Sequence, residues 1–226
     1  MRYDVITLFP EIIDSYCLSS ITKRGIESGI IEVETYNPRN YSLDKHKRVD
    51  DTPYGGGDGM VLACQPIFDC YNSIGKKKNF EFIMLTPQGE KFNQAMAVEL
   101  SKKEQIILLC GHYEGFDERI RLGLKPREIS IGDYVLTGGE LGALVLIDSI
   151  SRNLDKYLGK DKCALDDSFS GGLEGLLEYP HYTKPREYMG MKVPDVLLSG
   201  NHKEIEEFRK IQSIERTKLR RPDLLS

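Results

Sequence analysis

The 226-residue sequence predicts an α/β protein built on a parallel sheet, with a small, mainly helical domain at its C-terminal end. Short runs rich in β-branched residues alternate with helix-like segments through residues 1–150, a pattern typical of βα units. The run Gln105–Cys110 is apolar almost throughout, as in a parallel strand that is covered on both faces. Residues 153–172 are polar and dotted with glycine, which marks a linker before the helical end of the chain.

The first elements in chain order are a strand, a helix and a second strand. Tyr3–Leu8 has the composition of a short strand, and Phe9-Pro10 opens a segment with helical spacing of its apolar residues. Ile30–Tyr36 is expected as the second strand. Pro53–Met60 then contains four glycines, which implies unusual dihedral angles or the close approach of a partner. Val61–Ile74 is expected as a helix with a proline near its start.

Three further strands each end in a glycine-bearing loop. The strands are expected at Phe80–Leu85, Gln105–Cys110 and Glu128–Ile131, and the loops at residues 86–89, 111–115 and 132–139. The last loop leads into a strongly apolar helix, Glu140–Ile150. Because the C-terminal ends of parallel strands face the same edge of a sheet, these loops should converge on one crevice. A tight structural turn would explain one such loop, but three at successive strand ends favour a binding site.

Composition and cysteine content indicate a cytoplasmic globular protein. Hydrophobic residues make up 40% of the chain and charged residues 29%, so a sizeable core can form. No stretch approaches the roughly 20 apolar residues that span a bilayer, and the N-terminus lacks the pattern of a signal peptide. The five cysteines are odd in number and show no CxxC spacing, which favours reduced thiols over disulfides and disfavours a zinc site.

The net charge of −4 argues against a protein whose whole surface binds nucleic acid, but the charge is distributed unevenly along the chain. Arg209–Arg221 holds six basic residues against a single acid, and a second basic cluster lies at Lys45–Arg48. Such patches can bind phosphates on an acidic protein. A solvated helix face explains the same residues equally well.

Several common catalytic motifs are absent from the sequence. The loops contain no GxxxxGK[ST] motif, which excludes a P-loop hydrolase, and no GxGxxG motif with the following acid of a Rossmann site. No serine has a nucleophile-elbow setting, and His112 has no obvious partner in the sequence. The residues alone therefore indicate a nucleoside-type ligand held by backbone amides and carbonyls.

Five longer motifs narrow this down: Pro53-Tyr-Gly-Gly-Gly-Asp-Gly-Met60, Leu85-Thr-Pro-Gln-Gly89, Cys110-Gly-His-Tyr-Glu-Gly-Phe-Asp-Glu-Arg119, Ser130-Ile-Gly-Asp-Tyr-Val-Leu-Thr-Gly-Gly-Glu140 and Leu197-Leu-Ser-Gly-Asn-His202. Together they resemble the bacterial tRNA (guanine-N1)-methyltransferases, a family of the trefoil-knotted SPOUT class. The resemblance runs from the first strand to the basic C-terminal segment.

The resemblance implies a fold and an activity. Residues 1–158 would form a SPOUT domain with a deep trefoil knot within Leu85–Leu144, an exception to the rule that connections do not thread loops. Residues 159–174 would be a linker, and residues 175–226 a helical tRNA-binding domain. The family methylates N1 of the guanine just 3′ of the tRNA anticodon, using S-adenosylmethionine assisted by Mg²⁺. Its active sites lie at the subunit interface of a homodimer, and no membrane is involved.

The resemblance also implies roles for individual residues. Asp167 matches the general base, Arg152 an arginine that supports the target guanine, and Glu114 an acid at the target base. The residues matched to the methyl donor are Leu85, Thr86, Pro87, Gly111, Tyr113, Ile131, Gly132, Asp133, Tyr134, Val135, Leu136, Gly138 and Gly139. The position of Mg²⁺ is not implied.

These residue types suit the reaction. Guanine N1 carries a proton that must leave before its lone pair can attack a methyl group, and a carboxylate within hydrogen-bond reach can take that proton. An arginine can stabilise the charge that then develops toward O6.

Without the resemblance, plainer explanations would hold. Asp167 would be a solvated loop acid or a helix cap, and Glu114 a cap for the helix near Phe116. Arg152 would be part of a surface ion pair, and Tyr113 and Tyr134 core residues as readily as site residues.

The chain departs from the family pattern at two places. His112 stands where arginine is usual, and Cys163 stands where a small hydroxyl residue is common. Two other functions stay open. One is a SPOUT methyltransferase acting on ribosomal RNA or a ribose hydroxyl, and the other is a non-catalytic RNA-binding module.

Overall fold

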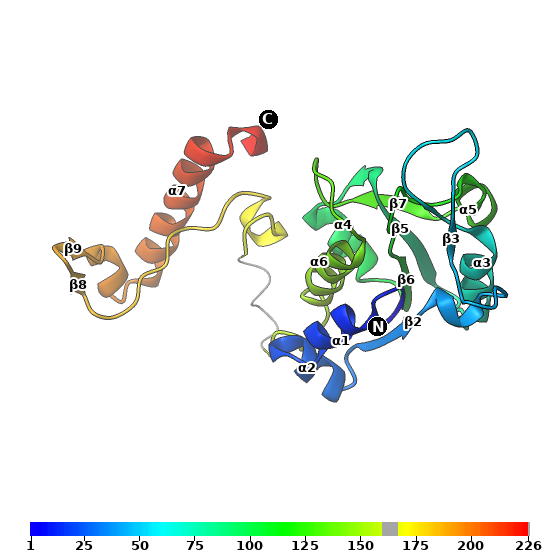
Figure 1. Ribbon diagram of the computed structural model, residues 1–226. Helices are drawn as coiled ribbons and strands as arrows, with labels where there is room; N and C mark the ends of the chain where they lie inside the picture. The colour runs from blue at the N-terminus through cyan, green and yellow to red at the C-terminus, as the bar shows by residue number, and fades with distance from the viewer. Residues whose placement is uncertain (160–166, 226) are drawn as a thin grey trace. The chain divides into compact units, whose positions relative to one another are not determined.

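The computed structural model describes residues 1–159 and 167–225 (Figure 1). The chain divides into two compact units, Met1–Gly159 and Lys160–Ser226. A five-stranded sheet forms the centre of the first unit, and the second contains one long helix.

All five strands of the sheet are parallel, which confirms the expected α/β class. Their spatial order is β2-β1-β6-β5-β7. In chain order the strands are β1 (Arg2–Ile6), β2 (Glu32–Tyr36), β5 (Phe80–Lys91), β6 (Gln105–Leu109) and β7 (Arg127–Ser130). The three strands predicted to end in glycine loops, β5, β6 and β7, are therefore neighbours.

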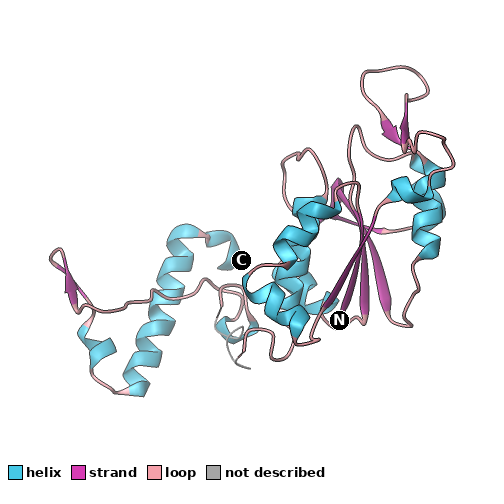
Figure 2. Cartoon of the chain, turned by 60° about the horizontal axis from the view of Figure 1, so that its bottom comes forward, coloured by secondary structure: helices cyan, strands magenta, loops and turns pink. Residues whose placement is uncertain are grey.

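Helices cover both faces of this sheet (Figure 2). One face packs against α1 (Pro10–Cys17), α2 (Ser20–Glu27), α4 (Gln94–Leu100) and α6 (Glu140–Ser151). The other packs against α3 (Cys64–Ser73) and α5 (Glu118–Leu124). A short 3-10 helix, η1 (Pro38–Tyr41), contacts α3. Double coverage explains why the strands are apolar at consecutive positions.

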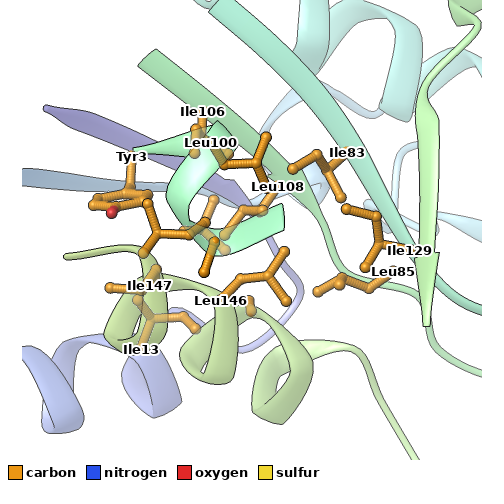
Figure 3. Packing of buried hydrophobic residues seen from close by; sticks show 14 of the residues in the cluster. Tyr3, Ile13, Ile83, Leu85, Leu100, Ile106, Leu108, Ile129, Leu146 and Ile147 are labelled. Atoms are coloured by element: carbon orange, nitrogen blue, oxygen red, sulfur yellow. The ribbon is translucent and has the colours of Figure 1, made fainter. Parts of the chain in front are cut away.

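The larger core cluster lies between the sheet and α1, α4 and α6 (Figure 3). Leu108 of β6 faces this cluster, while the next residue, Leu109, faces the opposite one, as the two-residue period of a strand requires. Leu146 and Ile147 of α6 are fully buried against it. Each such side chain contributes about 1.5–3 kcal/mol by leaving water, so α6 is held firmly to the sheet.

Two expected elements differ from the structure. The helix expected at Val61–Ile74 begins only at Cys64, because Val61–Leu62 forms a short strand, β4, antiparallel to β3 (Asp50–Asp51). The N–H of Leu62 donates to the carbonyl of Gly115, so this segment is tied to another loop instead of a helix.

The second difference concerns the strand expected to end at Leu85. It continues to Lys91 after a shift of register between Leu85 and Glu90, both of which face Ile129 of β7. Residues 86–89 are therefore a wide bulge within β5 and not the end of the strand.

The second unit contains a long helix, α7 (His202–Arg220), with Asn201 at its N-cap position. The basic residues of Arg209–Arg221 lie along this helix and at its end. The hydroxyl of Ser213 donates to the carbonyl of Leu177, which fixes the preceding segment on α7. The remaining elements are η2 (Gly171–Leu173), β8 (Glu187–Tyr188), β9 (Met191–Lys192), η3 (Asp195–Leu198) and η4 (Pro222–Leu225).

None of the helices in residues 1–159 and 167–225 is both long and apolar enough to cross a membrane.

Candidate active site

A crevice of about 350 Å³ opens beside the bulge in β5 and at the C-terminal ends of β6 and β7. Its walls come from the bulge at residues 85–88, the loop at 111–116 and the loop at 131–139. Parallel strands bring these three segments to one edge of the sheet, as the loop pattern predicted. The volume lies within the range of small-molecule sites.

Close backbone approach shapes the crevice at Gly139. A Cβ atom at this position would lie 2.7 Å from the Cα of Cys110, and the Gly139 N–H donates to the carbonyl of Gly111 at 2.9 Å. Only glycine allows two backbones to pack this closely. The loops after β6 and β7 are thereby joined at the base of the crevice, just before α6 begins.

The structure brings nearly all of the residues matched to donor binding into this crevice. Its lining includes Leu85, Thr86, Pro87, Gly111, Tyr113, Ile131, Gly132, Tyr134, Val135, Leu136, Gly138 and Gly139. Tyr113 and Tyr134 are 48% and 55% exposed, so neither is a core residue.

Asp133 is the one residue matched to donor binding that is not part of the crevice lining, although its neighbours Gly132 and Tyr134 are. Its carboxylate forms an ion pair with the ammonium of Lys91 at 2.9 Å and is largely exposed to solvent. The side chain therefore belongs to the outer surface of the loop.

Several lining residues were not singled out from the sequence: Gln88, Gly115, Phe116, Arg121, Ile129, Ser130, Thr137 and Gly142. Most of them lie within or directly beside the three loops that the sequence analysis identified, so their position along the chain could have indicated them. Arg121 of α5 is different, because it lies away from those loops and only the fold brings it near.

His112 also lines the crevice, and the structure supplies the partner that the sequence did not reveal. Its Nε2 lies 2.8 and 2.9 Å from the two carboxylate oxygens of Glu140, at the start of α6. Glu140 is 3% exposed and accepts a further hydrogen bond from the hydroxyl of Thr7 at 2.6 Å. This buried network ties the loop after β6 to the N-terminus of α6 and the end of β1.

Glu114 lies in the crevice lining and is exposed. It does not cap α5, because that role belongs to Asp117, whose carboxylate accepts from the N–H of Arg119 at 2.9 Å. The Arg119 guanidinium also holds the pKa of Asp117 well below its usual range. The capping alternative for Glu114 is therefore excluded.

The other two residues matched to catalysis are Arg152, which is not part of the crevice lining, and Asp167. Arg152 is the exposed C-cap residue of α6. Asp167 belongs to the second unit, where its carbonyl accepts from the N–H of Ser170. Cys163, the second departure from the family pattern, lies outside the described residues.

Cys110, the residue before Gly111, is buried at the end of β6. Complete burial and the nearby Glu140 raise the pKa of its thiol well above the ordinary range, so it stays protonated at neutral pH. Within residues 1–159 and 167–225, no three His, Cys, Asp or Glu side chains are grouped so that they could hold a metal ion.

Comparison with known proteins places the chain in a family. The family model described as tRNA (Guanine-1)-methyltransferase TrmD matches residues 1–226. The chain belongs to this family. A tRNA (guanine-N(1)-)-methyltransferase of Clostridioides difficile (strain 630) is 56% identical over 227 residues, covering 99% of this chain and 97% of that protein.

Proteins with the same name from Shouchella clausii and Moorella thermoacetica are 56% and 52% identical to this chain over its full length. The matched regions make up 91% and 90% of those two proteins. The chain is accordingly a methyltransferase, and the resemblance seen in its motifs is confirmed. The crevice beside the bulge in β5 and at the ends of β6 and β7 is then the leading candidate for the methyltransferase active site.

Proposed function

We propose that the chain transfers a methyl group from S-adenosylmethionine to N1 of the guanine immediately 3′ of the anticodon in tRNA, with Asp167 as general base. One observation carries this proposal. Every residue that the motifs match to donor binding, except Asp133, lines a single crevice in a chain that belongs to this methyltransferase family.

The crevice suits such a donor in size and chemistry. Backbone groups of residues 85–87, 111 and 131–139 can bind the polar edges of an adenine and a ribose. Leu136 and Tyr134, both partly exposed at the crevice, provide apolar surface for the base. The bound donor would supply a methyl group already activated by its sulfonium, so the chain needs no covalent nucleophile. This requirement agrees with the protonated thiol of Cys110.

Three side chains would then handle the target guanine. Asp167 takes the proton from N1 while the N1 lone pair forms a bond to the methyl carbon, and the carbon–sulfur bond breaks with its electrons going to sulfur. Arg152 stabilises the negative charge that develops at O6. Glu114, exposed in the crevice lining, accepts a hydrogen bond from the amide edge of the base.

The proposal extends to the assembly. Residues 1–158 form a SPOUT domain whose Leu85–Leu144 segment is threaded as a deep trefoil knot, residues 159–174 form the linker, and residues 175–226 bind tRNA. Two copies of the chain build each active site in a homodimer that works in the cytoplasm. Mg²⁺ would assist the reaction, although the described residues contain no group of three His, Cys, Asp or Glu side chains that could hold it.

A methyl-transfer assay on tRNA transcripts tests the activity. Transcripts with guanine after the anticodon should accept the methyl group, and matched transcripts with adenine there should not. Mass spectrometry of the product nucleosides should give N1-methylguanosine. A ribose-methylated product would favour the other SPOUT activity, and absence of donor binding by calorimetry would favour a non-catalytic RNA-binding module.

Two variants test the base. Asp167→Asn should lower the rate of transfer about 10²- to 10⁴-fold, the usual contribution of a general base, while donor affinity stays unchanged. Asp166→Asn, at the adjacent acid in the sequence, is the matched control and should retain activity. Near wild-type turnover by Asp167→Asn would show that the base has been assigned wrongly.

A further inference from the structure

The glycine-rich loop Pro53–Met60 is joined to the segment that carries Glu114. The N–H of Glu114 donates to the carbonyl of Met60 at 3.0 Å, and the N–H of Leu62 donates to the carbonyl of Gly115 at 2.9 Å. Leu62 also forms a parallel bridge with Phe116. Residues 60–62 and 114–116 therefore run side by side, with one end of the glycine loop directly beside the crevice lining.

Gly59 lies in direct contact with the Glu114 side chain. A Cβ atom at position 59 would be 2.7 Å from both Cγ and Oε1 of Glu114 and 3.1 Å from its Cδ. The other glycines of the loop differ in this respect, because a Cβ at Gly55, Gly56 or Gly57 would meet nothing within 4 Å. Among these four glycines, Gly59 is therefore the one at which packing leaves no room for a side chain.

The Glu114 carboxylate occupies the space that a side chain at position 59 would need. Among the described residues, no side chain forms a hydrogen bond or an ion pair with it. The backbone of Glu114 is held by Met60, while its side chain is exposed and lies beside Gly59. A side chain at position 59 would fill this space and force the Glu114 carboxylate into another position, without disturbing the core.

We propose that Gly59 is a positioning residue for the methyl-transfer reaction, because its lack of a side chain lets the Glu114 carboxylate lie against the loop backbone at the crevice. This inference rests on the proposed contact between Glu114 and the target guanine. It gives the glycine loop a function that the donor crevice does not account for, since residues 53–60 do not line that crevice.

The test compares alanine at two glycines of the same loop. Gly59 and Gly55 have nearly equal positive φ angles, 91° and 89°, so both substitutions place alanine at a φ that favours glycine. Only Gly59→Ala places a methyl group against Glu114. Since Glu114 is exposed and its side chain can rotate, both variants should show the same thermal unfolding midpoint and the same donor affinity.

The two variants should differ in methyl transfer. Gly59→Ala should lower kcat on tRNA about 10- to 100-fold, because a displacement near 1 Å of a group at the reacting base has effects of this size. Gly55→Ala should stay within about twofold of the wild type, because its Cβ would meet nothing within 4 Å and would leave Glu114 in place. Equal activity of Gly59→Ala and Gly55→Ala would overturn the proposal.

A double-mutant cycle separates a positioning role from general damage to the loop. Glu114→Ala alone should lower the rate of methyl transfer. In the Glu114→Ala background, Gly59→Ala should lower that rate no further than Gly55→Ala does, because the Glu114 side chain that Gly59→Ala displaces is already absent. Additive losses would overturn the inference while leaving the role of Glu114 intact. Wild-type activity of Glu114→Ala would instead refute the proposed role of Glu114, and the inference with it.

Discussion

The buried pair of His112 and Glu140 gives the sharpest prediction about stability. The Glu140 carboxylate has two side-chain partners, the His112 ring and the Thr7 hydroxyl. The His112 Nε2 lies within hydrogen-bond distance of both carboxylate oxygens, so the ring contacts the carboxylate edge-on. His112→Ala would leave a carboxylate that is 3% exposed with Thr7 as its single side-chain partner.

The expected loss follows from this geometry. Loss of one hydrogen-bond partner from a buried acceptor costs about 1–3 kcal/mol. The remaining Thr7 bond, and the position of Glu140 in the first turn of α6, keep the loss in the lower part of this range, because helix N-termini favour negative charge. A net loss of about 1–2 kcal/mol lowers the unfolding midpoint of a unit of this size by roughly 2–8 °C.

Differential scanning calorimetry measures the midpoint, and the chain offers a matched control. His181 pairs with Glu178 at 2.7 Å between the same atom types, but the His181 side chain is 62% exposed. His181→Ala should therefore cost no more than about 1 kcal/mol. His112→Arg, which restores the residue usual in the family, should keep the pairing with Glu140. A midpoint shift for His112→Ala no larger than that for His181→Ala would refute the reasoning.

Three further predictions concern the sheet, the crevice and the pH dependence of stability. Gly89→Ala should prevent correct folding, because its Cβ would lie 2.5 Å from the carbonyl carbon of Glu128 in β7; Gly75→Ala, where nothing lies within 4 Å, should fold normally, as circular dichroism would show. Asp133→Asn should leave donor affinity by calorimetry within about twofold, because the Asp133 side chain is exposed, pairs with Lys91 and is not part of the crevice lining. Burial raises the pKa of the Cys70 thiol to about 12, so its stabilising contribution is complete below about pH 8.5 and is lost as the pH rises toward 12. Urea unfolding at pH 8 and pH 10 should accordingly show a smaller alkaline loss of stability for Cys70→Ala than for the wild type.

The sheet was predictable because its signals are local. A strand covered on both faces is apolar at successive positions, and Gln105–Leu109, which forms β6, is buried at every residue. The bulge in β5 was not predictable from those signals. Glu90 and Lys91 are polar and follow a proline and a glycine, yet they pair with β7 because β7 extends beyond the bulge.

The crevice could be located from sequence for a related reason. It is built largely from backbone at strand ends, and close backbone packing leaves a mark in the sequence as glycine, as at Gly139. The pairing of His112 with Glu140 leaves no such mark, because the two residues lie 28 positions apart and meet only when α6 packs on the sheet. Contacts of this kind follow from the tertiary structure and have no local pattern.

Side-chain roles in catalysis are the hardest part to obtain from sequence, and the loop after β6 shows why. Glu114 and Asp117 belong to one motif, and both are acids beside a glycine loop. The structure separates them, because the Asp117 carboxylate is occupied by the backbone and guanidinium of Arg119. The Glu114 carboxylate has no such partner among the described residues and lies beside Gly59. Of these two acids, only Glu114 keeps its carboxylate available for hydrogen bonds to a substrate. Gly59, by lacking a side chain, leaves room for this carboxylate, which the proposed reaction uses.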